Sequence, residues 1–267
     1  MERFPAVAGQ FYPEQKRALN QFLDQSVTLD NAPAKALGIM VPHAGYVYSG
    51  AIAGHTFAKV TIPSKVVILG PNHHGVGRPI ALFGQGVWHT PLGQVTIDSD
   101  LGAALLQTCP LVQEDEQAHR FEHSLEVQVP FIQHLKPAAT ILPLCLGHIG
   151  LNDLVSVGEA LGRVIRDSGE PVLIVASSDM SHYIPGPVAK EKDFQALDRV
   201  LDLDPQGLFQ LVRSERISMC GVLPVVVMLT AVKVLGASQA TLIQYGNSGD
   251  INGDQSSVVG YAGVVVV

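Results

Sequence analysis

Side chains capable of chemistry follow short apolar runs in this 267-residue chain. His43 comes after "ALGIMV" in the motif "VPHAGYVYSG", and His73 and His74 come after "KVVILG" in "ILGPNHHG". Asp179 and His182 follow "PVLIVA" in "SSDMSHY". Imidazoles and carboxylates serve as proton carriers and as metal ligands. If the three apolar runs are strands of one sheet, their ends together would form a functional site.

The paired histidines are expected to have different roles. Adjacent side chains at the end of a strand point to opposite sides, so one of His73 and His74 should face a given pocket while the other supports or caps it. A lone histidine is more often a hydrogen-bonded structural residue than a ligand. That structural role is the expectation for the histidines at positions 55, 89, 119, 134 and 148.

Cys220 is the candidate reactive thiol. It precedes Gly221 and the apolar segment "GVLPVVVMLTAV", which is too short and too interrupted by proline to span a bilayer and is expected to be a buried helix. A helix N-terminus favours a thiolate, whereas Cys109 and Cys145 lie in apolar runs and should be inert. The alternative for Cys220 is a small apolar side chain that fills a gap in the core.

Alternating strand and helix patterns predict an α/β fold with helices on both faces of a central, mostly parallel sheet. The strands are expected at residues 36–41, 65–70, 139–147, 171–179, 240–246 and 257–266. The helices are expected at residues 13–25, 100–107, 151–169, 189–202, 205–214 and 221–232. Residues 86–98 are expected to form a β-hairpin that turns at Pro91 to Gly93. Ligands bind beyond the carboxyl ends of such strands, where the histidines and aspartate lie.

Composition excludes several classes of function. The chain is 47% hydrophobic and 15% charged, and no linker-like segment divides it, so we expect one domain over residues 1–267. A net charge of -7 without a basic run argues against nucleic acid and against an anionic membrane surface. The first residues lack the apolar stretch of a signal peptide, and the three cysteines are far apart, so a reducing cytoplasmic location is expected.

Five motifs together resemble one known family. "VPHAGYVYSG", "ILGPNHHG", "EHSLEVQVPF", "SSDMSHY" and "CGVLPV", in this order and at these separations, are similar to the Memo family, whose bacterial and archaeal members are called AmmeMemoRadiSam system protein B. The segments "PAVAGQFYP" and "GDQSSVVGYAG" near the two ends fit the same pattern. The resemblance covers essentially the whole chain and implies a single α/β domain similar to class III extradiol dioxygenases, which are non-haem iron enzymes.

The resemblance also implies a metal site and its ligands. In this chain the corresponding ligands are His43, His73 and Cys220, and the metal would be iron or copper, with zinc as a further possibility. Asp179 and His182 would line the same pocket. The remaining residues that the resemblance assigns to the pocket wall or to support of the ligands are His74, His123, Glu126 and Tyr46.

Two imidazoles and one anionic ligand leave coordination positions open for substrate and dioxygen, as in Fe(II) oxygenases. A thiolate is softer than a carboxylate, so it favours Cu(I) and zinc and donates more electron density to iron. We therefore expect a metal-dependent oxidoreductase that acts on a small molecule. The alternative is a non-catalytic protein that binds a metal ion or a peptide in the same cleft. Phosphotyrosine recognition is disfavoured because the five motifs contain no arginine.

Asp179 and His182 are the expected proton-handling pair. They lie three positions apart after a strand, and a carboxylate beside an imidazole fixes its tautomer and raises its basicity. The alternative is that Asp179 caps the following turn through backbone N–H groups. The family name further implies association with a radical SAM protein and an AMMECR1-type protein in one pathway.

Overall fold

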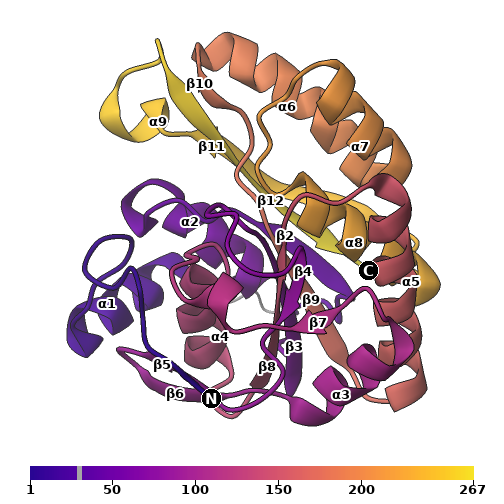
Figure 1. Cartoon of the computed structure of the whole chain (residues 1–267). Coiled ribbons are helices and arrows are strands. Elements are labelled where there is room, and N and C mark those ends of the chain that lie inside the picture. Colours follow the sequence, from indigo (N-terminus) through magenta and orange to yellow (C-terminus); the bar gives the residue numbers. More distant parts are fainter. Residues whose placement is uncertain (29–31) are drawn as a thin grey trace.

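A large mixed sheet runs through the molecule (Figure 1). The computed structural model describes residues 1–28 and 32–267. The strands of this sheet are, in spatial order, β10 (His182–Ile184), β12 (Val258–Val266), β2 (Gly38–Val41), β9 (Val172–Ser177), β3 (Lys65–Pro71), β8 (Thr140–Leu146), β4 (Ile80–Leu82) and β7 (Gln113–Glu114), and β11 (Ala240–Asn247) also pairs with β12.

All six expected strands are present, and the centre of the sheet is parallel. β2, β9, β3 and β8 are parallel neighbours, whereas β12 is antiparallel to β2, β10 and β11, and β4 is antiparallel to β8. The sheet is therefore mixed. For the β11–β12 pair the reason is the connection length: a short segment containing α9 (Gly249–Asn252) joins the two strands, and parallel neighbours would need a longer crossover.

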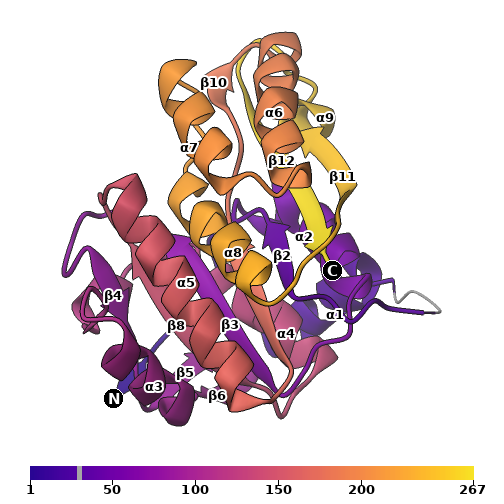
Figure 2. The same ribbon diagram turned by 90° about the vertical axis from the view of Figure 1, so that its right-hand side faces the viewer.

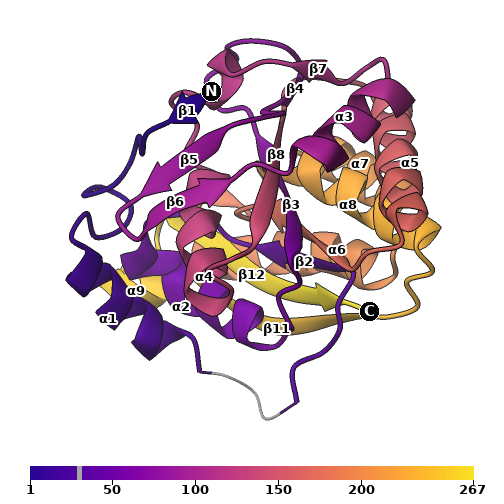
Figure 3. The ribbon, with the colours of Figure 1, turned by 90° about the horizontal axis from the view of Figure 1, so that it is seen from below.

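Helices cover both faces of the sheet, as the alternating pattern predicts. Figure 3 shows α1, α2 and α4 on one side of the strands and α3, α5 and α8 on the other. Figure 2 shows α5 and α8 side by side against the sheet. The helices are α1 (Lys16–Ser26), α2 (Tyr46–Ala58), α3 (Ser99–Thr108), α4 (Val129–Leu135), α5 (Leu151–Ser168), α6 (Gly186–Leu201), α7 (Pro205–Ser214) and α8 (Val222–Val234).

The six expected helices occur within a few residues of their predicted bounds, whereas α2 and α4 were not expected. α2 has the sequence "YVYSGAIAGHTFA" and is buried along most of its length. It packs between α1 and strands β2, β11 and β12, so it has no wide polar face. A helix that is enclosed in this way lacks the amphipathic period by which helices are recognised in a sequence.

The predicted hairpin is also present, in a second small sheet. β5 (Val87–Thr90) and β6 (Gly93–Thr96) are antiparallel, and β1 (Glu2–Arg3) runs parallel to β5. Two short 3-10 helices, η1 (Gln117–His119) and η2 (Glu126–Gln128), lie between β7 and α4. η1 precedes the "EHSLE" motif, and η2 begins at its last residue. No helix within the described part of the chain is long and apolar enough to cross a membrane.

Candidate functional site

The ends of three neighbouring parallel strands meet at one cavity. β2, β9 and β3 lie next to one another, so the residues that follow them emerge at the same edge of the sheet. The cavity there has a volume of about 510 Å³, and its wall includes His43, His73, His123, Asp179 and His182. The convergence of polar side chains that the sequence predicted is therefore present.

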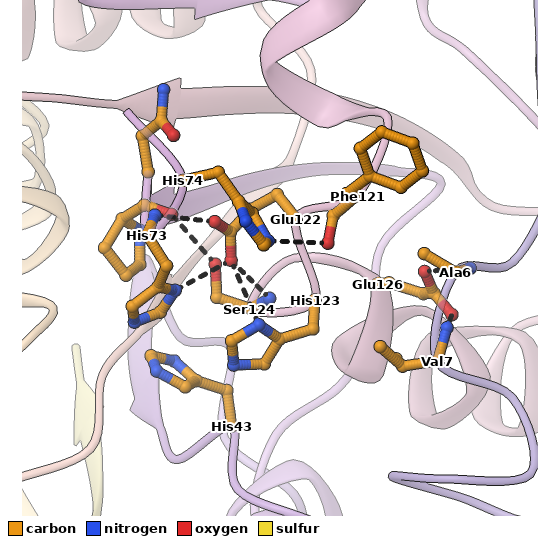
Figure 4. A network of polar contacts seen from close by, with 12 residues as sticks. Ala6, Val7, His43, His73, His74, Phe121, Glu122, His123, Ser124 and Glu126 are labelled. Carbon is orange, nitrogen blue, oxygen red and sulfur yellow. Dashed lines mark hydrogen bonds and ion pairs between the residues drawn. The ribbon is translucent and has the colours of Figure 1, made fainter. Parts of the chain in front are cut away.

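Three imidazoles form the polar centre of this cavity. One ring nitrogen from each of His43, His73 and His123 lies within 4.8 Å of the other two, a spacing that suits a common metal ion. Figure 4 shows the three rings gathered around one point. His43 follows β2, His73 follows β3, and His123 comes from the loop between η1 and η2. The rings of His73 and His123 are stacked, with centroids 4.7 Å apart and an angle of 22° between their planes.

His73 is oriented by the buried carboxylate of Glu122. The ring Nδ1 of His73 lies 2.9 Å from Glu122 Oε1, and the backbone N–H of His73 donates to Glu122 Oε2 at 2.7 Å. Oε1 also accepts the backbone N–H of Ser124 at 2.9 Å (Figure 4). Burial alone would raise the pKa of Glu122, but the hydrogen bond and the charge of His73 outweigh it and hold that pKa well below its usual range.

The loop that carries Glu122 and His123 is pressed against the end of β3. A Cβ atom at Gly70 would lie 2.5 Å from Leu125 Cδ1 and 2.7 Å from Ser124 Oγ, so only glycine allows this approach. Ser124 Oγ also donates to the carbonyl of Pro71 at 3.1 Å. The close packing brings His123 beside His73.

The tautomer of His43 follows from its neighbours. The hydroxyl of Ser177 donates to the carbonyl of Ser124 at 2.7 Å, and it accepts an N–H of Gln128 at 2.9 Å. Its single hydrogen is used, so the contact of 2.9 Å between Ser177 Oγ and His43 Nδ1 requires Nδ1 to carry the proton. The lone pair of His43 is then on Nε2, the nitrogen that faces the thiol of Cys220 at 3.1 Å.

Cys220 reaches the site because α8 begins close to the end of β9. A Cβ atom at Gly221 would collide with the Ser177 carbonyl oxygen, so a glycine is needed for this approach. Burial, together with the negative charge of Asp179, raises the pKa of the Cys220 thiol well above its ordinary value. The thiolate expected from the position at a helix N-terminus is therefore disfavoured in the metal-free protein, because burial outweighs the hydrogen bonds to the sulfur.

Burial keeps two of the imidazoles in the neutral form that binds metals. It lowers the pKa of His43 well below its usual range, with the neighbouring imidazoles adding to the effect. It lowers the pKa of His123 to about 4, against the opposing charge of Glu122. A neutral imidazole has a free lone pair on one nitrogen, so these rings are ready to act as ligands near pH 7.

Asp179 lines the cavity and ties it to the loop after β2. Its Oδ1 accepts the backbone N–H of His43 at 2.7 Å, and the N–H of Ala44 also donates to the carboxylate. The carboxylate thus caps the loop after a neighbouring strand, not its own turn. Burial raises the pKa of Asp179 to about 6, although both N–H donors lower it.

His182 shares the cavity, but its tautomer is set by Ser218. The Nδ1–H of His182 donates to the carbonyl of Ser218 at 2.9 Å, and the backbone N–H donates to Ser218 Oγ at 2.7 Å. A carbonyl oxygen only accepts, so Nε2 of the neutral ring carries a lone pair. The expectation that Asp179 fixes this tautomer is wrong, because the Nδ1 proton of His182 is directed by the Ser218 carbonyl.

Three other residues that the resemblance assigned to the pocket lie outside the imidazole cluster. His74 turns away from His73, as predicted, and its Nε2–H donates to the Phe121 carbonyl at 3.0 Å (Figure 4). The hydroxyl of Tyr46 donates to the carbonyl of Val127 at 2.7 Å in the core, and Tyr48 lines the cavity instead.

Glu126 belongs to a separate buried network. It forms an ion pair of 2.7 Å with Arg3, and it accepts the backbone N–H groups of Ala6 and Val7 and the hydroxyl of Tyr12. These partners all come from the N-terminal segment. Glu126 therefore anchors that segment and does not line the cavity.

Glu122 is a residue beside the imidazole cluster that the sequence analysis did not single out. It is the first residue of "EHSLE", directly before His123, and that adjacency was the available signal.

The lone histidines expected to be structural include His119, which is fully buried with Nε2 3.0 Å from the carbonyl of Ala81. Cys109 and Cys145 are buried, as expected of core thiols.

Known proteins similar to this chain agree on one family. The family described as Memo-like protein matches residues 3–265. A MEMO1 family protein of Methanopyrus kandleri is 40% identical over 279 residues, which cover 99% of both chains. A MEMO1 family protein of Aquifex aeolicus is 42% identical over 265 residues, which cover 98% of both chains.

A solved structure supports the fold. The crystal structure of an uncharacterized protein from Escherichia coli K12 superimposes with a TM-score of 0.58 and covers 84% of this chain and 98% of that one. At 15% sequence identity this similarity concerns the fold alone. The family match over residues 3–265 and the full-length relatives show that the chain belongs to the Memo family.

Proposed function

We propose that this protein is a metal-dependent oxidoreductase that acts on a small molecule. The observation that carries the proposal is the group of three imidazoles at the cavity, with the thiol of Cys220 in contact with one of them. The nitrogens of His43, His73 and His123 lie within 4.8 Å of one another, and the sulfur of Cys220 lies 3.1 Å from His43 Nε2. Iron or copper bound there would supply one-electron chemistry with dioxygen.

The donors fit a transition metal by their chemistry. Metal–nitrogen and metal–sulfur distances of about 2.0 and 2.3 Å allow one ion to contact two atoms that are 3.1 Å apart. Neutral imidazoles and a sulfur select iron, copper or zinc over magnesium or calcium, which prefer oxygen ligands. In this proposal His43, His73 and Cys220 are ligands, as the resemblance implies, and His123 is a further ligand on the evidence of its position.

Asp179 and His182 would handle protons in the reaction. The pKa of Asp179 is raised by burial to about 6, near the pH at which the group would work, and the lone pair of His182 is on Nε2. Both side chains line the cavity with the imidazole cluster. A side chain positioned in this way could accept a proton from a bound hydroxyl group and return it later.

The cavity suits an uncharged or weakly charged small molecule. Its walls contain the aromatic side chains of Phe11, Tyr48, Tyr183 and Tyr261, and among its described wall residues there is neither lysine nor arginine. Phosphorylated peptides usually need arginine, so they are poor candidates. We further propose that the protein works in the cytoplasm, in a pathway with a radical SAM protein and an AMMECR1-type protein.

The number of possible nitrogen and sulfur ligands favours one alternative function. Four nitrogen and sulfur ligands complete the tetrahedral shell of zinc and leave no open position, which is typical of structural sites. A protein with zinc held in that way would be a non-catalytic metal-binding or peptide-binding protein that uses the same cleft.

Nitric oxide distinguishes the two functions. The protein is purified without oxygen, its metals are measured, and the Fe(II)-loaded form is exposed to nitric oxide and examined by electron paramagnetic resonance. Nitric oxide binds ferrous iron only at an open coordination position. We expect about one ion per chain and a nitrosyl signal. A chain that binds iron without giving this signal contradicts the oxidoreductase, and a chain that binds no ion contradicts both functions.

A further inference from the structure

We propose that Glu122 is a positioning residue that sets the ring orientation and tautomer of His73 and His123, so that both present Nε2 to the same metal ion. The inference rests on the proposed metal site, and it concerns a residue that neither the motif resemblance nor the metal-ligand spacing identifies. In Figure 4, Glu122 lies on the side of His73 and His123 that is opposite His43.

Glu122 contacts His73 at two points. Oε2 accepts the backbone N–H of His73 at 2.7 Å, and Oε1 lies 2.9 Å from its Nδ1. Two contacts from one rigid carboxylate fix both the loop and the ring, whereas a single contact would leave the ring free to turn about it. Oε1 is itself held by the backbone N–H of Ser124 at 2.9 Å.

His123 shares the same oxygen. Its Nδ1 lies 3.5 Å from Glu122 Oε1, and its ring is stacked on that of His73 with an interplanar angle of 22°. Two nearly parallel rings whose Nδ1 atoms face one carboxylate turn their Nε2 atoms in the same general direction. The shared carboxylate therefore explains why the two imidazoles converge.

The chemistry of the carboxylate decides the tautomer. An ionised carboxylate only accepts hydrogen bonds, so Nδ1 of His73, which is 2.9 Å away, must carry the proton. The negative charge favours the same tautomer of His123, whose Nδ1 is 3.5 Å away. The proton on Nδ1 leaves the lone pair on Nε2, where a metal can bind. His43 is placed in the same tautomer independently, by the hydroxyl of Ser177.

The position of Glu122 is itself supported from outside the site. Glu122 is 1% exposed, and the guanidinium of Arg3 donates to its backbone carbonyl at 2.8 Å. Arg3 therefore still holds the backbone at Glu122 when the carboxylate is changed.

The first test measures tautomers in the metal-free protein by long-range nitrogen–proton nuclear magnetic resonance. We expect His73 and His123 of the unchanged chain to be protonated at Nδ1. In Glu122→Gln the amide nitrogen cannot accept a hydrogen bond, so His73 should shift towards a mixture of tautomers. Protonation of His73 at Nε2 in the unchanged, metal-free chain would overturn the inference, and this measurement does not depend on whether the variant folds.

The second test measures zinc affinity by competition with a chelator. Glu122→Gln should bind zinc about 10- to 100-fold more weakly than the unchanged chain, as is typical when a partner of a ligating histidine is lost. The matched control is Glu126→Gln. It removes a buried carboxylate of the same motif, and that carboxylate contacts none of the three imidazoles. The folded control should keep full zinc affinity.

The outcomes separate this inference from the proposed function. Equal zinc affinity in Glu122→Gln and the unchanged chain overturns the positioning role while the metal site stands. An equal loss in both variants shows a general structural effect and also overturns it. If the unchanged chain binds no metal, the proposed function fails, and the tautomer of His73 still decides whether Glu122 orients the ring.

Discussion

The sulfur of Cys220 lies 3.1 Å from Nε2 of His43, although the two residues are 177 positions apart in the chain. His43 follows β2, and Cys220 precedes α8, whose start is packed against the end of β9. The contact joins the motif "PHAGY" to the motif "CG". It makes the thiol a neighbour of the imidazole cluster, so Cys220 can be tested as a ligand directly.

Cys220→Ser should remove the thiolate signature of a cobalt-substituted protein. The unchanged chain loaded with Co(II) is expected to show an intense near-ultraviolet charge-transfer band from the sulfur, and Cys220→Ser should lack it and bind the ion more weakly. Optical titration measures both effects. Persistence of the band in Cys220→Ser would show that this thiol is not a ligand, and His43→Ala serves as a variant that should lose the ion while it keeps the cysteine.

The two adjacent histidines should differ sharply in metal binding. His73→Ala removes a ligand and should reduce metal occupancy severely, whereas His74→Ala should reduce affinity little, because its Nε2 bonds to the Phe121 carbonyl outside the cluster. Elemental analysis after dialysis compares the two variants under the same conditions. Equal losses would show that the pair supports the loop and that His73 is not a specific ligand.

His182→Ala should keep the metal and lose turnover. The substitution removes the imidazole that lines the cavity outside the imidazole cluster, and general acid–base assistance typically contributes about 10²- to 10⁴-fold to a rate. Asp179→Asn tests the second group, since its amide oxygen can still accept the His43 N–H. Turnover per bound ion, measured once a substrate is known, checks both variants. Full turnover in His182→Ala would contradict a proton-handling role.

Acid should destabilise the metal-free protein between pH 6.5 and about 4. Burial lowers the pKa of His119 from 6.5 to about 4, so the folded chain binds fewer protons than the unfolded chain in this window. Unfolding therefore takes up a proton, and the free energy of unfolding falls by ~1.4 kcal/mol per pH unit for each such group as the pH is lowered.

Burial also lowers the pKa values of His43 and His123, so both groups add to the loss of stability in acid. Urea denaturation at a series of pH values measures the slope. His119→Gln should reduce the slope of the unfolding free energy against pH by nearly the contribution of one proton. An unchanged slope in that variant would contradict this role of His119.

The ion pair of Arg3 and Glu126 should be important for stability but not for metal binding. Both side chains are almost completely buried, so Glu126→Gln removes the carboxylate that balances the Arg3 charge and should cost about 3–5 kcal/mol. Glu159→Gln is the matched control, because its partner Arg163 is about half exposed and such pairs contribute about 0–1 kcal/mol. Chemical denaturation compares the two losses, and similar values would contradict the role of burial.

The local pattern of the sequence determined the strands, most of the helices and the residues at the strand ends. Apolar runs bounded by glycine or proline marked β2, β3 and β9, and parallel order then implied that His43, His73 and Asp179 share one edge. These features depend on neighbouring residues in the chain, so they can be read without the fold. The opposite directions of His73 and His74 follow from the same strand geometry.

Tertiary structure alone decided which residues complete the site. Tyr46 and Tyr48 are about 200° apart around the first turn of α2, so one enters the core while the other lines the cavity, and the packing of α2 determines which. Glu122 gains its role because the absence of a side chain at Gly70 lets a distant loop pack on β3. The direction of a side chain depends on long-range packing, and no local period in the sequence records it.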